Sequence, residues 1–376
     1  MSQSIHSYIL SRLQQRKAEN NFRSLKRLSG LVDFTSNDYL GLANDPALQR
    51  QIALEWSEAE QAASGSTGSR LLSGNSAYAE NLEIMLASFH QGPAALLFNS
   101  GFDANYGLLS TLPYKGDTIL YDELVHASIH DGIRSSKAVA LSFAHNRTDE
   151  LELKLRQASG RKYVVVESVY SMNGDLAPLQ EIADLCESLD AGLIVDEAHA
   201  TGILGPQGKG LVVQLQLQNR VLARVHTFGK AIGAHGAVII CHQHLKDFLI
   251  NYCRPFIFST ALPLHTLVAV KCAYDLLQHD TTRLEQLNRN IQLFKQAMKG
   301  VTKFSLLPGD SPIQSVVIPG NEAVKTAALA IQQQGLDVRP ILYPTVPKGE
   351  ERIRICLHSF NTEAEVLKLV QAIHSL

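Results

Sequence analysis

The chain has 376 residues, of which 45% are hydrophobic and 19% charged, and its 34 basic and 36 acidic side chains leave a net charge of −2. At roughly 150 residues per domain, this composition predicts a folded protein of about two domains and excludes a disordered or fibrous chain. A nearly neutral chain without a basic block or an apolar run of ~18 residues favours neither nucleic acid nor membrane as a partner, and without an evident signal peptide we expect a cytoplasmic protein.

The predicted elements begin with one amphipathic helix and continue as alternating strands and helices. Residues 4–23 carry apolar side chains at helical spacing among polar ones. Short β-rich runs then alternate with helical stretches, and these runs lie at 95–98, 118–121, 163–166, 193–195, 225–228 and 237–241. This alternation predicts an α/β fold whose mostly parallel central sheet is flanked by helices.

The strand–helix–strand pattern is clearest after Pro178, where apolar residues follow a 3.6-residue period until Gly192 ends the helix. From about residue 263 the pattern changes to long helices, a strand-like run at 315–318 and a closing helix with a Thr362–Glu365 capping box. We therefore expect an N-terminal arm at 1–42, a large domain at 43–265 and a small α+β domain at 266–376.

Chemically useful side chains follow several of the predicted strands. Because ligands of open α/β sheets bind at the carboxyl ends of the strands, these residues are the candidates for a site. The segment 99–102 (NSGF) leads into a helix whose N-terminal N–H groups suit an anion, although an ordinary strand-to-helix turn remains the alternative. Asp196 ends another strand, where its charge requires a cationic partner unless it serves as a helix N-cap.

Lys230 follows a further strand, 34 residues after Asp196. A lysine at that position is either a phosphate ligand or a nucleophile that forms an imine, and the chain lacks the usual nucleotide-binding fingerprints. An aspartate and a lysine at the ends of two strands suit pyridoxal 5′-phosphate. The amine holds the cofactor aldehyde, and the carboxylate keeps the ring nitrogen protonated.

A metal site is not expected from the histidines and cysteines. The fourteen histidines include no HExxH pair, and the five cysteines form no CxxC pair.

Five segments resemble the α-oxoamine synthases, which are pyridoxal phosphate enzymes of the aspartate aminotransferase fold. They are 36–42 (SNDYLGL), 65–74 (GSTGSRLLSG), 171–175 (SMNGD), 196–202 (DEAHATG) and 227–230 (TFGK). The similarity extends over nearly the whole chain and implies a fold type I enzyme with an acyltransferase activity. Two positions depart from the family pattern: Thr67 replaces a glycine and Ala79 a histidine.

The resemblance implies a role for each matching residue. Lys230 would bind the cofactor and move the Cα proton, Asp196 would pair with the ring nitrogen, His199 would donate to the ring hydroxyl, and His126 would stack on the ring. Further cofactor contacts would come from Gly101, Phe102, Ser171 and Thr227, with Ser259 and Thr260 reaching the phosphate of a neighbouring subunit in a homodimer. The substrate would contact Arg23, Asn37, Thr345 and Arg354.

The same resemblance indicates small-molecule substrates. Segments 36–42, 227–230 and 344–347 are most similar to the member that condenses L-alanine with a pimeloyl thioester of CoA or an acyl-carrier protein (ACP). A second member of the family, which uses glycine and acetyl-CoA, is the alternative, because one methyl group is worth only about 1–3 kcal/mol of discrimination. A non-catalytic protein that kept the fold is a more remote alternative.

Overall fold

The computed structural model describes residues 4–25, 30–58, 63–301 and 303–376. Contacts within the chain define two compact units. The larger unit comprises Asn37–Ser171 and Asp175–Glu285, and the smaller unit comprises Met1–Ser36, Met172–Gly174 and Gln286–Leu376. The domain boundaries expected near residues 42 and 265 remain a prediction. Two units that are defined by their internal contacts do not show which segment folds independently.

The larger unit is built on a seven-stranded sheet in the order β2-β8-β7-β6-β5-β3-β4. Its strands are β2 (Ala94–Phe98), β3 (Thr118–Asp122), β4 (Val139–Phe143), β5 (Lys162–Glu167), β6 (Ala191–Asp196), β7 (Ala223–Thr227) and β8 (Ala237–Cys241). Only β8 runs antiparallel to its neighbours, β2 and β7. The predicted mostly parallel α/β sheet is therefore confirmed.

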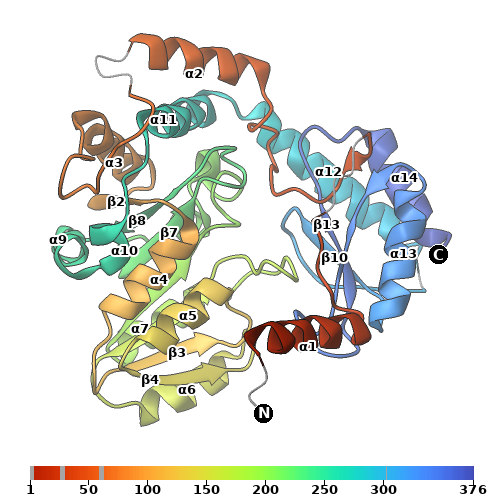
Figure 1. Cartoon of the computed structure of the whole chain (residues 1–376), viewed down its shortest axis with the longest axis horizontal. Helices are drawn as coiled ribbons and strands as arrows, with labels where there is room; N and C mark the ends of the chain where they lie inside the picture. The colour runs from red at the N-terminus through yellow and green to blue at the C-terminus, as the bar shows by residue number, and fades with distance from the viewer. Residues whose placement is uncertain (1–3, 26–29, 59–62, 302) are drawn as a thin grey trace. The chain divides into compact units, whose positions relative to one another are not determined.

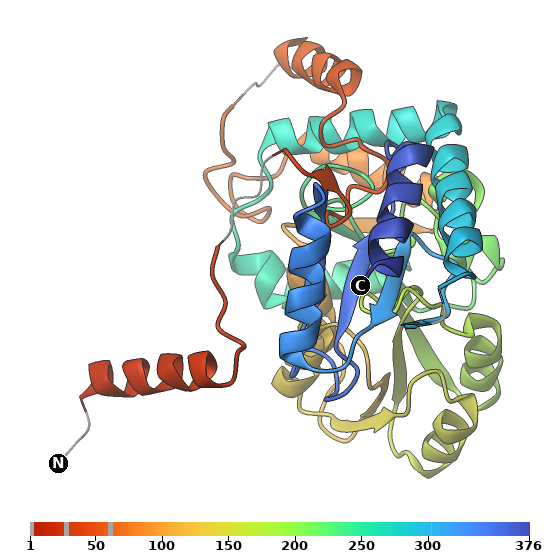
Figure 2. The same cartoon turned by 90° about the vertical axis from the view of Figure 1, so that its right-hand side faces the viewer.

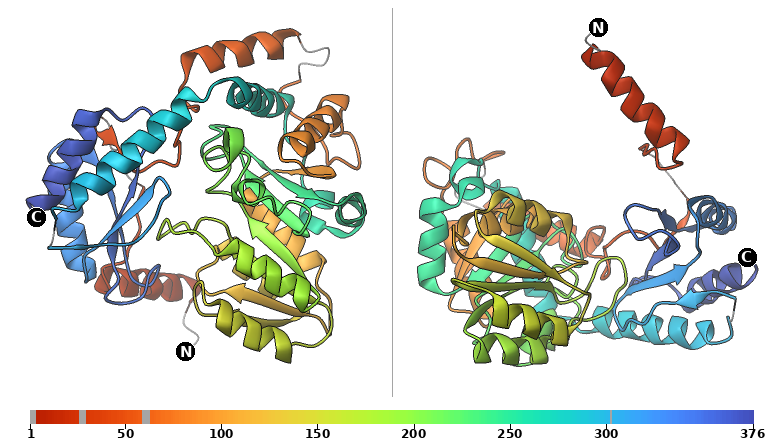
Figure 3. Two further views of the ribbon diagram at one scale, coloured as in Figure 1. Left: turned by 180° about the vertical axis from the view of Figure 1, so that it is seen from behind. Right: turned by 90° about the horizontal axis from the view of Figure 1, so that it is seen from below.

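Helices cover both faces of this sheet. In Figure 1, α4 (Gly101–Thr111) and α5 (Ala127–Ser135) lie in front of the strands, and α7 (Leu179–Ser188) lies in front when the molecule is seen from behind in Figure 3. The other helices of this unit are α2 (Pro46–Glu58), α3 (Ala77–Phe89), α6 (Thr148–Gln157), η1 (Pro206–Gly208), α8 (Leu211–Gln214), α9 (Gln243–Tyr252), α10 (Arg254–Phe258) and α11 (Leu264–His279). With helices on both faces, strands β2, β7 and β8 are buried along their whole length.

Helix α7 shows how the sequence specifies this unit. Leu179, Ile182, Ala183 and Cys186 are buried against the sheet, as their spacing predicts. The helix ends at Ser188, and Gly192 lies just inside β6, where a Cβ atom would stand 2.8 Å from the side chain of Leu222. The strand–helix–strand prediction for this region is confirmed, but the prediction that Gly192 ends the helix is wrong, because Leu189 is the C-cap and Gly192 belongs to β6.

The smaller unit combines two small sheets with helices, as Figure 2 shows. Strands β12 (Arg339–Ile341), β13 (Arg352–Cys356), β10 (Ile313–Val317) and β9 (Ser305–Leu306) form an antiparallel sheet, and β1 (Val32–Asp33) pairs with β11 (Leu336–Asp337). The helices are α1 (Ile5–Ala18), α13 (Asn321–Gln332), α14 (Glu363–His374) and most of α12 (Thr282–Met298). The predicted Thr362–Glu365 capping box starts α14.

Helix α1 has no buried residue, so the amphipathic pattern predicted for 4–23 leaves its apolar side chains exposed in the single chain. Among the described residues, no helix combines the length and the apolar character needed to cross a bilayer.

Candidate active site

A cavity of about 290 Å³ opens where strands β5, β6 and β7 end in the larger unit. This volume is near the lower end of typical ligand pockets, which measure ≈ 300–1,000 Å³. Eight of the residues singled out from the sequence line it: Asn37, Gly101, Phe102, His126, Asp196, His199, Thr227 and Lys230. The structure thus brings together residues that are up to 193 positions apart in the chain.

Asp196 lies at the end of β6 with only 5% of its surface exposed. Its Oδ1 accepts a hydrogen bond from the Ala198 N–H at 2.8 Å, and its Oδ2 accepts one from Asn105 Nδ2 at 2.7 Å. Both donors are neutral, so neither supplies the cationic partner that the sequence predicts. Residues after Asp196 form turns and no helix, so the N-cap alternative does not apply.

Two further buried polar atoms belong to residues that line the cavity. Within the described part of the chain, neither Thr227 Oγ1 nor Glu167 Oε1 has a hydrogen-bond partner. Burial raises the pKa of Glu167 well above its usual value, and the Asp196 charge raises it further. A buried polar atom without a partner costs ≈ 1–3 kcal/mol. A polar ligand that reaches these atoms would therefore be bound favourably.

Helix α4 begins at the same cavity and meets the end of β7. A Cβ atom at Gly101 would stand only 2.4 Å from Thr227 Cγ2, so glycine is required for this close approach. The first N–H groups of a helix have no partner within it and carry a partial positive charge. Ser100, the N-cap of α4, and Gly101 both line the cavity, which places this helix end where an anion can bind.

Two of the basic residues that line the cavity, Lys230 and His126, come from different turns. Lys230 follows β7 in a turn that a hydrogen bond from the Gly233 N–H to the Lys230 carbonyl closes at 2.9 Å. His126 is the N-cap of α5. Desolvation by the surrounding protein and the positive charge of Lys230 lower the pKa of His126, while the Asp196 carboxylate acts in the opposite direction.

His199 is hydrogen-bonded to the SNDYLGL segment, residues 36–42. Its Nδ1 lies 2.8 Å from the Tyr39 hydroxyl, which also donates a hydrogen bond to Asn37 Oδ1 at 3.1 Å. Asn37 and His199 both line the cavity, so this segment contributes to the cavity wall through Asn37.

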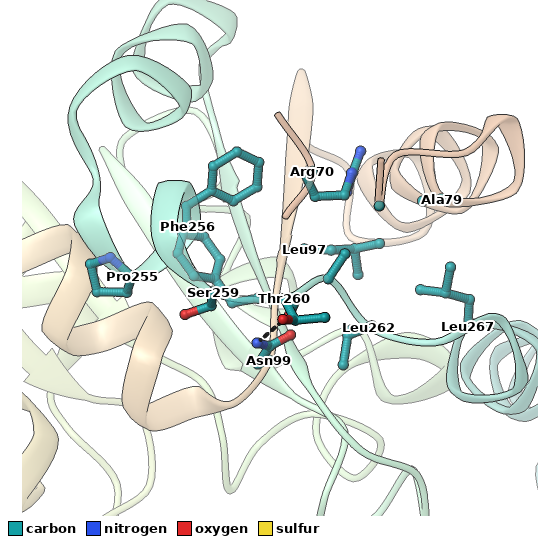
Figure 4. A pocket seen from close by; sticks show the side chains of 13 residues that line it. Arg70, Ala79, Leu97, Asn99, Pro255, Phe256, Ser259, Thr260, Leu262 and Leu267 are labelled. Carbon is teal, nitrogen blue, oxygen red and sulfur yellow. Dashed lines mark hydrogen bonds between the residues drawn. The ribbon is translucent and has the colours of Figure 1, made fainter. Parts of the chain in front are cut away.

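Ser259 and Thr260 lie in a different pocket, which Figure 4 shows. There the Asn99 amide donates a hydrogen bond to the Thr260 carbonyl at 2.8 Å. Both residues are on the chain that follows α10. Ser171 belongs to the turn after β5 and is not part of the lining of either pocket among the described residues.

The remaining predicted substrate contacts belong to the smaller unit. Arg354 is on β13, opposite Ser315 of β10, and its Nη1 lies 3.0 Å from Cys356 Sγ. Thr345 and Arg23 are exposed.

The sequence analysis assigned no role to Asn105 or Glu167. Glu167 ends β5 just as Asp196 ends β6, and the two residues are paired in the sheet register, so its position was a usable signal. Asn105 is one turn into α4 and reaches the site only because α4 packs on the sheet. No sequence pattern marks such a residue.

The model of the family "aminotransferase class I and II" matches residues 29–373. The chain belongs to this family. It is 42% identical to an 8-amino-7-oxononanoate synthase from Emericella nidulans over 373 residues, covering 92% of this chain and 89% of that protein.

Solved structures support the same assignment. A serine palmitoyltransferase from S. paucimobilis, determined with a bound PLP–myriocin aldimine, has a TM-score of 0.90 at 26% identity, covering 99% of this chain and 97% of the other. An 8-amino-7-oxononanoate synthase from Francisella tularensis has a TM-score of 0.80 at 28% identity, covering 93% and 98%. The fold and the resemblance to 8-amino-7-oxononanoate synthases predicted from the sequence are confirmed.

Proposed function

We propose that this chain binds pyridoxal 5′-phosphate in the cavity around Lys230. The enzyme then condenses L-alanine with pimeloyl-CoA or pimeloyl-ACP, giving 8-amino-7-oxononanoate, carbon dioxide and the free thiol, a step of biotin biosynthesis. The observation that carries the proposal is the meeting of Lys230, Asp196, His199 and His126 in one cavity of a chain 42% identical to such a synthase.

The residues of the cavity fit this cofactor. Lys230 would hold the aldehyde carbon, and Asp196, whose two hydrogen-bond donors in the described part of the chain are neutral, would pair with the protonated ring nitrogen. The phosphate would bind at the N-terminus of α4, where the unpartnered Thr227 Oγ1 is a further hydrogen-bonding group. When bound, pyridoxal phosphate supplies an electron sink for the charge that develops at the substrate Cα.

The chain's own groups then bind and orient the substrate and move its proton. The Lys230 amine takes the proton from the Cα of L-alanine, as a base held next to the reacting carbon. The Arg354 guanidinium binds the amino-acid carboxylate as a two-pronged donor, with Arg23, Thr345 and Asn37 as the further substrate contacts. Asp196 and His199 act by fixed charge and hydrogen bonding, which needs no reorganisation during the reaction.

The active enzyme in this proposal is a cytoplasmic homodimer. Ser259 and Thr260 line a pocket separate from that of Lys230, which agrees with a role toward the phosphate of the neighbouring subunit. The departure at Thr67 lines a third pocket, which in this proposal takes the acyl part of the thioester.

Thiol release by the cofactor-loaded protein tests the proposed substrates. L-Alanine plus pimeloyl-CoA is compared with glycine plus acetyl-CoA at equal concentrations, and a reaction without amino acid corrects for thioester hydrolysis. We expect strong preference for the first pair. Preference for the second pair would move the enzyme to the glycine-dependent branch of the family, and release with neither pair would contradict an acyltransferase that accepts CoA thioesters.

A further inference from the structure

A continuous chain of hydrogen bonds joins His126 to Asp196 along the wall of the cavity. The Asn105 amide nitrogen donates to Asp196 Oδ2 at 2.7 Å and to Ser128 Oγ at 3.1 Å. Ser128 Oγ lies 2.8 Å from His126 Nδ1, and the Ser128 N–H donates to the same nitrogen at 3.2 Å. Asn105 is 4% exposed and Ser128 is fully buried, so bulk water does not compete for these bonds.

The proton positions follow from the donors available. The two protons on Asn105 Nδ2 are both used, one for each partner. Ser128 Oγ accepts one of them, so its own proton is free to point toward His126 Nδ1. Because this nitrogen then accepts from both the hydroxyl and the N–H of Ser128, the ring proton of a neutral His126 is on Nε2.

We propose that Asn105 and Ser128 are positioning residues that keep His126 in its neutral Nε2–H form and reserve the Asp196 carboxylate for the ring nitrogen of the cofactor. The proposal rests on pyridoxal phosphate being the ligand of this cavity. It assigns a purpose to two buried side chains that do not take part in the chemical steps themselves.

Desolvation and the surrounding charges act on the His126 proton in opposite directions: desolvation and Lys230 favour the neutral ring, and Asp196 opposes them. Asp196 and Glu167 on the strand ends, Lys230 on the turn after β7 and His130 on α5 are the titratable groups that act on this ring or its backbone. Of these, the Asp196 carboxylate favours a protonated His126. An imidazolium would compete with the ring nitrogen for that carboxylate. Donors aimed at Nδ1 favour the neutral ring, because a protonated Nδ1 cannot accept them.

Measurements of cofactor affinity distinguish this positioning role from a role in folding alone. Pyridoxal phosphate and its 1-deaza analogue, which has a carbon in place of the ring nitrogen, are titrated into the full-length chain and into Asn105→Leu and Ser128→Ala. The loss of a hydrogen bond to a charged group weakens binding about tenfold. We expect that loss for pyridoxal phosphate with Asn105→Leu and no corresponding loss for the analogue. Equal weakening of both ligands would overturn the proposal.

Ser136→Ala is the matched control, because Ser136 caps the end of the same helix, where its hydroxyl donates to the Ile133 carbonyl at 2.8 Å and accepts from the Ala138 N–H at 3.3 Å. Its affinity for both ligands should equal that of the wild type. We expect Ser128→Ala to bind pyridoxal phosphate more weakly than the wild type. Ser128→Thr keeps the hydroxyl and should bind it as the wild type does, provided the circular dichroism of Ser128→Thr matches that of the wild type.

The tautomer is measured independently on the cofactor-free chain. The ¹⁵N signals of His126, identified by their loss in His126→Gln, should show an unprotonated Nδ1 at neutral pH, and Ser128→Ala should raise the pKa of this ring. A protonated Nδ1 in the wild type would contradict the proposal even if the cofactor binds. Failure of the wild type to bind pyridoxal phosphate would instead overturn the proposed function, while the ¹⁵N result would still decide the state of His126.

Discussion

The Tyr39 hydroxyl lies 2.8 Å from Nδ1 of His199, and the two rings are tilted by 53° with their centres 6.2 Å apart. Tyr39 is fully buried and His199 is 5% exposed. This contact joins the SNDYLGL segment to the turn after β6. It explains in physical terms why a tyrosine near the N-terminus of the chain belongs to a site built mainly from strand ends.

Replacing Tyr39 with phenylalanine should raise the activation free energy for kcat by more than it lowers the free energy of unfolding. The change leaves His199 Nδ1 without its partner, at a cost of about 1–3 kcal/mol, and the ring loses its orientation. Steady-state kinetics and thermal unfolding would measure the two effects. Tyr163→Phe, which removes the hydroxyl of another buried tyrosine, on β5, serves as the control. A kcat unchanged from the wild type would contradict a role for this contact.

The close approach of α4 to β7 predicts the effect of a single methyl group. Gly101→Ala should weaken pyridoxal phosphate binding, because the new Cβ would stand 2.4 Å from Thr227 Cγ2. Thr227→Ser removes that methyl group and keeps the hydroxyl, so the double variant should bind better than Gly101→Ala alone. Gly65→Ala, where a Cβ would meet nothing within 4 Å, is the control. Absence of rescue in the double variant would show that another contact is responsible.

Thr67, one of the two departures from the family, has φ of 53° and is exposed. Left-handed backbone costs a β-branched residue roughly 1–2 kcal/mol, part of which is offset because threonine restricts the unfolded chain. We expect Thr67→Gly to raise the free energy of unfolding by about 0.5–1 kcal/mol. Denaturant titration would measure it. Ser64→Gly, in the same loop at a residue without a positive φ, should instead be neutral or destabilising.

His145 joins two acidic side chains of the larger unit. Its Nδ1 lies 3.0 Å from Asp122 Oδ1 and its Nε2 lies 2.6 Å from Asp175 Oδ2, while the Tyr170 ring packs edge-on against it. Burial by itself would lower the pKa of His145, but the hydrogen bonds and charges of Asp122 and Asp175 raise it to about 9. A charged His145 therefore forms ion pairs with Asp122, at the end of β3, and with Asp175, the last residue of SMNGD.

The raised pKa predicts how stability depends on pH. A histidine that titrates at about 6.5 unfolded and about 9 folded stabilises the protein fully below pH 6.5, by on the order of 3 kcal/mol. That contribution is lost as the pH rises through 9. The difference in free energy of unfolding between the wild type and His145→Gln should therefore shrink from pH 6 to pH 10. A difference independent of pH, or one as small as that of the exposed His244→Gln, would refute the ion pairs.

The sheet was predictable where burial governs the sequence. Strand β8 was predicted with the observed bounds, 237–241, because a strand buried on both faces is a continuous apolar run. Strand β4 (VALSF), at the sheet edge, was missed: four of its five residues are apolar, but Ser142 interrupts them and three of the five are exposed. Edge strands are specified by pairing, here with β3, which no local pattern reveals.

The site residues that could be predicted from the sequence are those at the ends of strands or in the turns that follow them. Asp196 is the last residue of β6 and Lys230 lies in the turn after β7, so their chemistry can be inferred from position. Asn105 and Ser128 lie on helices and enter the network through tertiary packing of α4 on α5, which a single sequence does not encode locally. The orientation of Asp196 therefore depends on a residue that sequence patterns do not identify.

The central claim is that Lys230 holds pyridoxal phosphate, and chemical trapping tests it most directly. The full-length chain is incubated with the cofactor, reduced with borohydride and digested, and the modified lysine is found by mass spectrometry. Lys230→Ala and the exposed-lysine variant Lys115→Ala are treated in parallel. We predict a single cofactor adduct on Lys230, unchanged in Lys115→Ala and absent from Lys230→Ala. An adduct on another lysine of the wild type, or none, would contradict the account.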